Sequence, residues 1–207
     1  NLSEIAFHIF NPLDNPLLQY NEDDGLKIEP IWYIPIVPMI LINGSKGIGT
    51  GFSTDVPCHN PEEVVKNLFN LMDNKPTQQM KPWYRGFQGK IEFKKINEVG
   101  AHQYVNHGSY KVLDDTTVFI TELPIGFSTE NYKKFLESLL YDKNNESEKQ
   151  KQCLVDFTNH STEKIVKILL KFKKEILKDL ILNHKFETLF KLNDSKYTNY
   201  SNMHLYN

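Results

Sequence analysis

Apolar residues recur along the chain with two periods, which predict helices in some segments and strands in others. Spacings of three and four residues predict helices over residues 1–10, 61–73, 128–141 and 174–183. Alternating residues predict strands at 90–95, 102–106, 110–113 and 117–121, and a further strand-forming run lies at 164–172. The first four strands follow one another closely, which favours an antiparallel meander with a turn at Asp114-Asp115. A last strand is expected near Leu205. The expected fold class is α/β in the broad sense (α+β), a mixed, mainly antiparallel sheet with flanking helices.

The composition of the segments between these elements predicts which of them are buried and which lie at the surface. Residues 11–29 are rich in turn formers and acids, and predict a surface connection. Residues 32–42 are almost wholly apolar and predict buried extended chain, whereas the polar residues 142–151 predict a loop. The clearest helix start lies at Asn60-Pro61, where a capping side chain precedes a proline and two acids.

A glycine cluster follows the apolar run and is the most informative local feature. Its members are Gly44, Gly47, Gly49 and Gly51, with Ile48 between the second and the third. Glycine lets the backbone approach another surface closely, because it has no Cβ. A large apolar side chain at such a place is costly to leave in water. Two interpretations therefore stay open: Ile48 is tucked into the protein at a tight turn, or it enters a partner.

Glycine clusters also bind phosphate, and both relevant templates can be compared with these residues. The dinucleotide pattern G-x-G-x-x-G, begun at Gly47, requires glycine where Phe52 stands. The P-loop pattern, begun at Gly44, requires lysine where Thr50 stands. Each template fails at a residue that carries its chemistry, so a nucleotide-binding loop is disfavoured.

Composition places the chain among globular proteins. It has 207 residues, of which 40% are hydrophobic and 24% charged. No apolar run is long enough for a membrane span, no signal peptide is recognisable, and Cys58 and Cys153 are too few for a disulfide framework or a cysteine zinc site. These features favour an intracellular protein. The first residue is Asn1 rather than methionine, from which we expect a piece of a longer polypeptide.

The net charge of −2 conceals a segregation of charge along the sequence. Residues 1–63 carry two lysines and nine acids, whereas residues 66–111 carry eight basic residues and three acids, and residues 163–191 eight lysines and four acids. Such segregation could place a basic face on phosphate, but taken alone it favours ordinary solvated surface. Arg85, the single arginine, lies among aromatic residues and is either a phosphate ligand or part of a packed turn.

Several motifs together resemble the eukaryotic type IIA DNA topoisomerases. The resemblance is sharp from about Glu29 to Pro124 and is looser beyond. The motifs that carry it stand in the family's order: Glu29–Pro35 leading to Gly47–Ser53, Val56-Pro57 with Asn60–Val64, Pro82–Gly89, and Ile120–Pro124.

The resemblance implies a place in the enzyme and a set of DNA contacts. In that family the matching region is the tower, which lies between the winged-helix domain and the coiled-coil arm and holds the DNA that is cut. By this resemblance residues 1–28 end the winged-helix domain and its connection, and residues 29–207 form the tower. An isoleucine at the position of Ile48 wedges between base pairs. The residues expected to bind DNA are Lys46, Gly47, Ile48, Gly49, Thr50, Gly51 and Arg85.

Lys46 departs from the family, which has an acidic residue at this position, and it either contacts phosphate or is simply exposed. The catalytic tyrosine, the magnesium triad and the ATPase domain would fall upstream of Asn1. We therefore expect no catalytic residue, metal site or cofactor in this chain, and an isolated piece that is inactive.

The resemblance also implies properties of the parent enzyme. The parent would be a nuclear, homodimeric, ATP-dependent type II topoisomerase that acts in chromosome segregation and uses magnesium. It would pass one duplex of double-stranded DNA through a transient break in another, changing supercoiling and decatenating DNA. No membrane partner is expected, and the piece alone is compatible with a monomer. The alternatives are a non-catalytic nucleic-acid-binding module of an unrelated protein and a nucleotide-dependent enzyme.

Overall fold

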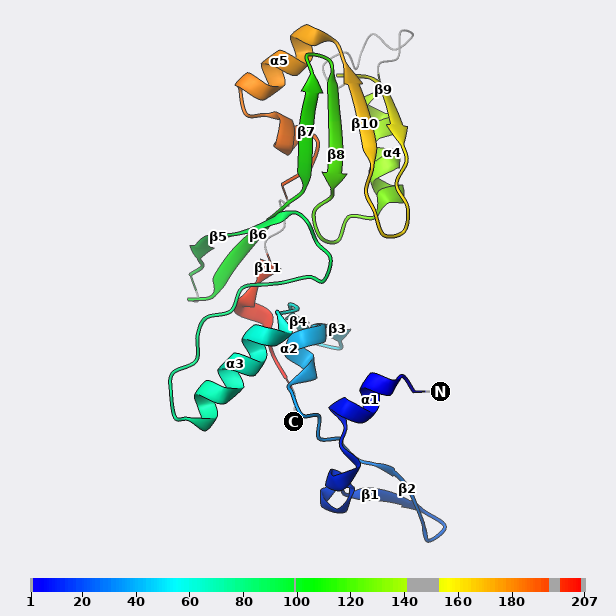
Figure 1. Ribbon diagram of the computed structural model, residues 1–207, viewed down its shortest axis with the longest axis vertical. Coiled ribbons are helices and arrows are strands. Elements are labelled where there is room, and N and C mark those ends of the chain that lie inside the picture. The colour runs from blue at the N-terminus through cyan, green and yellow to red at the C-terminus, as the bar shows by residue number, and fades with distance from the viewer. Residues whose placement is uncertain (1, 99, 141–152, 194–197, 206–207) are drawn as a thin grey trace. The chain divides into compact units, whose positions relative to one another are not determined.

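The computed structural model describes residues 2–98, 100–140, 153–193 and 198–205 (Figure 1). The chain divides into two compact units. Unit 1 comprises Asn1–Pro82 with Asn202–Asn207, and unit 2 comprises Trp83–Ser201. Within the described ranges, no helix combines the length and apolar character that a membrane crossing requires. The mixed α+β class predicted from the sequence is confirmed, with small antiparallel sheets and several helices.

Unit 1 begins with helix α1 (Glu4–Ile9) and the 3₁₀ helix η1 (Pro12–Leu17). A hairpin of β1 (Tyr20–Asp23) and β2 (Leu26–Pro30) follows, so the prediction of a turn-rich connection over residues 11–29 was incomplete. The missed signal is the Asp24-Gly25 dipeptide, whose φ angles of 48° and 77° are both positive. Aspartate and glycine are the residues that a type I′ hairpin turn favours.

The prediction of buried extended chain over residues 32–42 was wrong. Trp32 is 42% exposed and Tyr33 57%, and the segment ends in helix α2 (Met39–Asn43). The physical reason lies in Pro35 and Pro38, which have no amide hydrogen to donate to a sheet. A proline is compatible with the residue before a helix, and Pro38 occupies that position at α2.

Helix α3 (Pro61–Met72) starts where the sequence predicted. The Glu62 amide donates to the Asn60 side-chain oxygen at 2.9 Å, which satisfies one of the free donors of the first turn. Asn67 is buried on this helix and makes two hydrogen bonds with Gln78: its Nδ2 donates to the Gln78 carbonyl at 2.9 Å, and its Oδ1 accepts from the Gln78 amide at 2.7 Å. The asparagine therefore ties the segment after α3 back to the helix.

Unit 2 contains the predicted strands, but they belong to two sheets rather than to one meander. One sheet has the order β11-β6-β5, and the other β7-β8-β10-β9, with antiparallel neighbours throughout. The strands are β5 (Lys90–Ile96), β6 (His102–His107), β7 (Ser109–Asp114), β8 (Thr117–Glu122), β9 (Leu154–Asn159), β10 (Ile168–Phe172) and β11 (Thr198–Asn199).

The division falls at Gly108, between β6 and β7. Its amide donates to the Leu192 carbonyl at 2.6 Å, and a Cβ there would lie 2.5 Å from the Glu122 carbonyl oxygen. Two backbone segments thus approach the chain at the point where it leaves one sheet for the other, and only glycine fits.

The helices of unit 2 complete a contiguous core. Helix α4 (Thr129–Leu139) is capped by Ser128, as predicted, and lies against the β10–β9 side of its sheet (Figure 1). Helix α5 (Lys174–Leu182) was also predicted, whereas α6 (Phe186–Leu189) was not. The buried core residues are Val118, Ile120, Leu123, Tyr132, Leu136, Leu139, Leu154, Ile168, Leu170, Phe172, Leu177, Leu180, Phe186, Phe190 and Leu192.

The remaining predictions, which concern residues 142–205, differ from the structure in several places. The strand expected over 164–172 begins only at Ile168, and β9 had not been predicted. Leu205 lies in no strand, and the strand nearest to it in sequence is β11, which is followed by a 3₁₀ turn (Tyr200–Asn202). The loop predicted over 142–151 lies outside the described residues.

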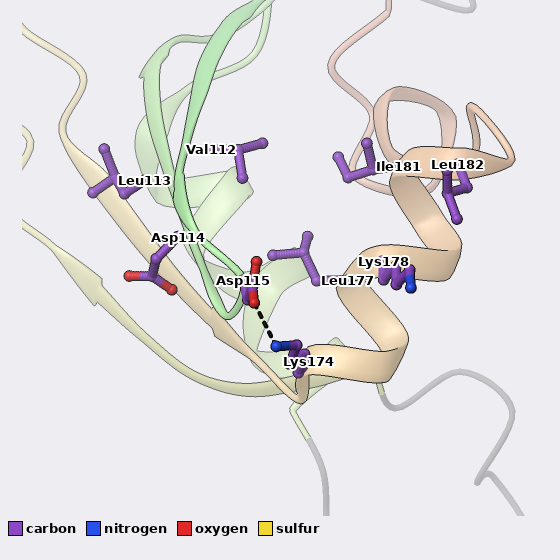
Figure 2. Close-up of a pocket in the computed structure, with 9 residues that line it drawn as sticks. All are labelled: Val112, Leu113, Asp114, Asp115, Lys174, Leu177, Lys178, Ile181 and Leu182. Carbon is purple, nitrogen blue, oxygen red and sulfur yellow. Dashed lines mark ion pairs between the residues drawn. The ribbon is translucent and has the colours of Figure 1, made fainter.

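A groove of about 560 Å³ lies beside α5 (Figure 2). Val112 and Leu113 of β7 line one side, and Leu177 and Ile181 of α5 the other. At one end the Lys174 ammonium forms an ion pair with Asp115 at 2.6 Å, which joins the β7–β8 turn to the start of α5. The turn predicted at Asp114-Asp115 falls one residue later, because Asp114 pairs with Thr117 across the strands.

Candidate nucleic-acid interface

The glycine cluster folds into a short β-hairpin of unit 1. Strand β3 (Ser45–Gly49) pairs with β4 (Phe52–Val56), and Thr50-Gly51 make the turn between them. Gly51 has a φ of +80°, the left-handed value that the third position of a type II turn requires. The sequence pattern predicted this tight glycine turn but not the strands on either side of it.

Alternation along the two strands gives the hairpin two different faces. Lys46 pairs with Asp55 and Ile48 with Ser53, so these four residues share one face. Val56 lies on the opposite face and is 5% exposed, whereas Ile48 is 89% exposed. The interpretation that tucked Ile48 into the protein is therefore wrong.

The glycines of this hairpin have two distinct roles. At Gly44 the φ is +68°, and a Cβ would lie 2.6 Å from the Val56 carbonyl oxygen, so the fold itself requires glycine there. At Gly47 and Gly49 the nearest atoms to a Cβ would be 4.0 and 3.8 Å away, which is ordinary contact. Packing within the chain therefore does not explain these two glycines. They leave bare backbone beside Ile48, on which an external surface could lie.

Two polar contacts hold the hairpin side chains near Ile48. The Lys46 ammonium lies 3.0 Å from the Asp55 carboxylate, and both side chains are more than half exposed. The Asn202 amide nitrogen donates to Ser53 Oγ at 3.0 Å, although the two residues are far apart in sequence. Lys46, predicted to contact phosphate or to be simply exposed, is exposed but has an acidic partner within the chain.

The base of the hairpin is anchored by the Cys58-His59 pair, whose members have separate partners. The Cys58 thiol donates to the Asn43 carbonyl at 3.0 Å, and burial raises the pKa of that thiol. The His59 amide donates to the Leu41 carbonyl at 2.8 Å, and its Nδ1 lies 3.0 Å from the same oxygen. Burial lowers the pKa of His59, which is 1% exposed. A neutral thiol and a neutral imidazole with these contacts make an anchor rather than a nucleophilic couple.

Arg85 lies in unit 2, on the turn from Tyr84 to Phe87. The Phe87 amide donates to the Tyr84 carbonyl at 3.1 Å, and Gly86 has a φ of +83°. The Arg85 side chain is exposed. The predicted turn is thus present, and the arginine on it is exposed to solvent rather than packed.

Glu122 joins two of the motifs that had been recognised separately. Its carboxylate accepts the Gln88 amide at 3.0 Å and the Leu123 amide at 3.1 Å. It thereby links the Pro82–Gly89 motif to the Ile120–Pro124 motif. The sequence alone assigns no role to Glu122, and its only local signal is its position two residues before Pro124.

The predicted DNA-binding residues therefore separate into two groups. Lys46, Gly47, Ile48, Gly49, Thr50 and Gly51 all lie on the β3–β4 hairpin, whereas Arg85 lies in the other unit. The basic residues of 66–111 are divided in the same way, with Lys66, Lys75 and Lys81 in unit 1 and the others in unit 2. Among the described residues, no three His, Cys, Asp or Glu side chains are grouped as a metal site would need.

Comparison with known proteins gives consistent matches over the whole chain. The family model that describes the A subunits of DNA gyrase and topoisomerase IV matches residues 1–207. A DNA topoisomerase 2 from Pisum sativum is 40% identical over 205 residues, which cover 99% of this chain and 13% of the relative. One from Drosophila melanogaster is 39% identical over 171 residues, 83% of this chain and 11% of the relative.

A solved structure agrees with these relatives. The DNA-binding, cleavage and re-ligation domain of Plasmodium falciparum topoisomerase II superimposes with a TM-score of 0.83 at 34% identity. The match covers 96% of this chain and 25% of that one. The chain thus spans about an eighth of the two relatives named above and a quarter of the solved domain.

Proposed function

This chain belongs to the family of DNA gyrase and topoisomerase IV A subunits, among relatives of the eukaryotic DNA topoisomerases II, and we propose that it is the DNA-bending part of such an enzyme. The complete protein would be an ATP-dependent type II topoisomerase that passes one duplex through a transient break in another. Strand passage of this kind changes supercoiling and decatenates DNA. Within it, this chain would bind and bend the duplex that is cut.

The observation that carries the proposal is the exposure of Ile48. An isoleucine that is 89% exposed on a hairpin end loses the free energy that burial would give it. Insertion between base pairs recovers that free energy and kinks the duplex, at a cost of about a few kcal/mol per unstacked step. The bare backbone at Gly47 and Gly49 lets the hairpin lie close to the sugar-phosphate wall.

The hairpin geometry also argues against nucleotide binding. Phosphate-binding glycine loops lead from a strand into a helix, whose free amide groups receive the phosphate. The loop at Thr50-Gly51 leads into a second strand instead. An unrelated nucleic-acid-binding module is not favoured either, because the family match extends over the whole chain.

The partners and cofactors follow from this function and are part of the proposal. The binding partner is double-stranded DNA, and the complete protein would act as a homodimer in the nucleus. ATP and magnesium would be bound by other parts of the complete protein.

The test is replacement of Ile48 by alanine in the complete protein. Ile48→Ala should reduce DNA bending and DNA cleavage about tenfold or more, since most of the apolar surface that enters the duplex is lost. ATP hydrolysis without DNA should be unchanged. Bending is measured by fluorescence transfer between the ends of a labelled duplex. Ile165→Ala removes the same side-chain atoms from an isoleucine of unit 2 that is 52% exposed, and is the matched control. Unchanged bending in Ile48→Ala would remove the proposed role.

A further inference from the structure

We propose that Lys46 and Asp55 are a positioning pair, which fixes the register of the β3–β4 hairpin and so the face on which Ile48 stands. The inference rests on the proposed function of Ile48 but assigns a different task to its neighbours. Lys46 had been grouped with the DNA contacts. The structure instead places its ammonium 3.0 Å from a carboxylate on the facing strand.

The hairpin needs such a device because its own backbone specifies register weakly. Strand β3 contains Gly47 and Gly49, which offer no side chain to pack, and glycine-rich strands are prone to slip. The turn adds little to the specification of register. Primed turns match the twist of the two strands that they join, whereas a type II turn does not. Two of the five cross-strand pairs contain a glycine, so they provide no contact between facing side chains.

A slip of one residue would have a definite consequence for the wedge. Val56 and the Cys58–Asn43 contact hold both strands at the base, so a slip would arise further out, in the glycine-containing part of β3. Side chains alternate between the faces, and a shift of β3 by one residue would turn Ile48 to the face of Thr54 and Phe52. The same shift would place Lys46 opposite Thr54 or Val56 and separate its charge from Asp55.

The ion pair opposes this slip because it is satisfied only in the observed register. Opposite charges that face each other directly across two strands stabilise the pairing, and like charges destabilise it. A second contact acts in the same sense: Asn202 donates to Ser53, the residue that directly faces Ile48. The two contacts lie on the face that Ile48 occupies, one at its partner Ser53 and one two cross-strand pairs further from the turn.

The test uses three charge variants: Lys46→Asp, Asp55→Lys, and the double exchange that restores an opposite-charge pair. Amide hydrogen exchange of residues 45–56 in the 207-residue chain measures how firmly the hairpin is held. Each single variant should raise exchange about fivefold, as expected for replacing a favourable exposed pair by a repulsive one, and the double exchange should return it to within twofold. Lys27→Asp alters charge equally on another exposed strand of unit 1 and should leave these amides unchanged.

DNA bending by the complete protein supplies the second measurement. If the pair positions Ile48, bending should fall in both single variants and recover in the double exchange. If Lys46 contacts phosphate directly, Lys46→Asp should lose bending that the double exchange does not restore, and Asp55→Lys should strengthen DNA binding. That second pattern would overturn the proposal, as would unchanged hairpin exchange in both single variants.

These outcomes are distinct from failure of the proposed function. That function fails if Ile48→Ala bends DNA normally, in a protein whose Lys46–Asp55 pair is intact. The positioning role fails on the exchange measurement alone, which involves no DNA.

Discussion

The two units of the chain hold their folds in different ways. Unit 2 has a contiguous core in which residues such as Ile120, Leu136 and Phe190 are fully buried. Among the described hydrophobic side chains of unit 1, only Val56 and Val64 are buried, whereas Leu13 is 82% exposed and Met72 77%. Unit 1 depends instead on caps, tight turns and hydrogen bonds such as the Asn67–Gln78 pair. Burial therefore stabilises one unit, and local polar contacts shape the other.

The strongest test of this difference is to remove the same side chain from each unit. Leu136→Ala should lower the free energy of unfolding of unit 2 by about 2–5 kcal/mol, because a buried leucine leaves a cavity. Leu13→Ala should change stability by less than about 0.5 kcal/mol. Urea unfolding followed by hydrogen exchange measures both changes. Similar costs for the two variants would show that the comparison is false.

The next test concerns the close backbone contact that unit 1 does contain. Gly44→Ala should destabilise the hairpin base by about 2–3 kcal/mol, since it combines a left-handed φ with a Cβ 2.6 Å from the Val56 carbonyl oxygen. Gly51→Ala has the same φ strain in open space and should cost about 1 kcal/mol. Exchange of the hairpin amides measures both. Equal costs would mean that the contact at Gly44 is unimportant.

The smallest expected effect is the pH dependence of unit 1. Because burial lowers the pKa of His59, the unfolded chain binds a proton more readily than the folded chain. The free energy of unfolding is therefore highest above the ordinary histidine pKa of about 6.5, where His59 is neutral in both states. It decreases as the pH falls below that value, by at most about 1.4 kcal/mol per pH unit. Amide exchange of residues 41–59 at pH values from 7.5 to 5 measures it, after correction for the intrinsic exchange rate. His59→Gln should flatten this profile, and an unchanged profile would contradict the assignment.

Local signals predicted the elements whose cause is local. Asn60 and Ser128 mark the starts of α3 and α4 because their side chains cap the next turn. Alternation found strands β5 to β8, but it carries no information on which sheet each strand joins. That division depends on Gly108, where a long-range contact with Leu192 separates the sheets.

For the candidate site too, the sequence predicted the local features and not the long-range contacts. The glycine pattern located the turn and raised the question of where Ile48 points, and only the structure answered it. The pairing of Lys46 with Asp55 could have been found by counting back from a two-residue turn, once a hairpin was assumed. The contact between Ser53 and Asn202 spans 149 residues, so no local pattern could have revealed it.

The exposure of Ile48 has a consequence for how variants of this protein should be sought. A side chain that touches almost nothing within its own chain can be exchanged without unfolding it, so screens for expression or solubility will be blind to position 48. Only a selection that depends on the protein's activity in a living cell would distinguish one residue from another at position 48.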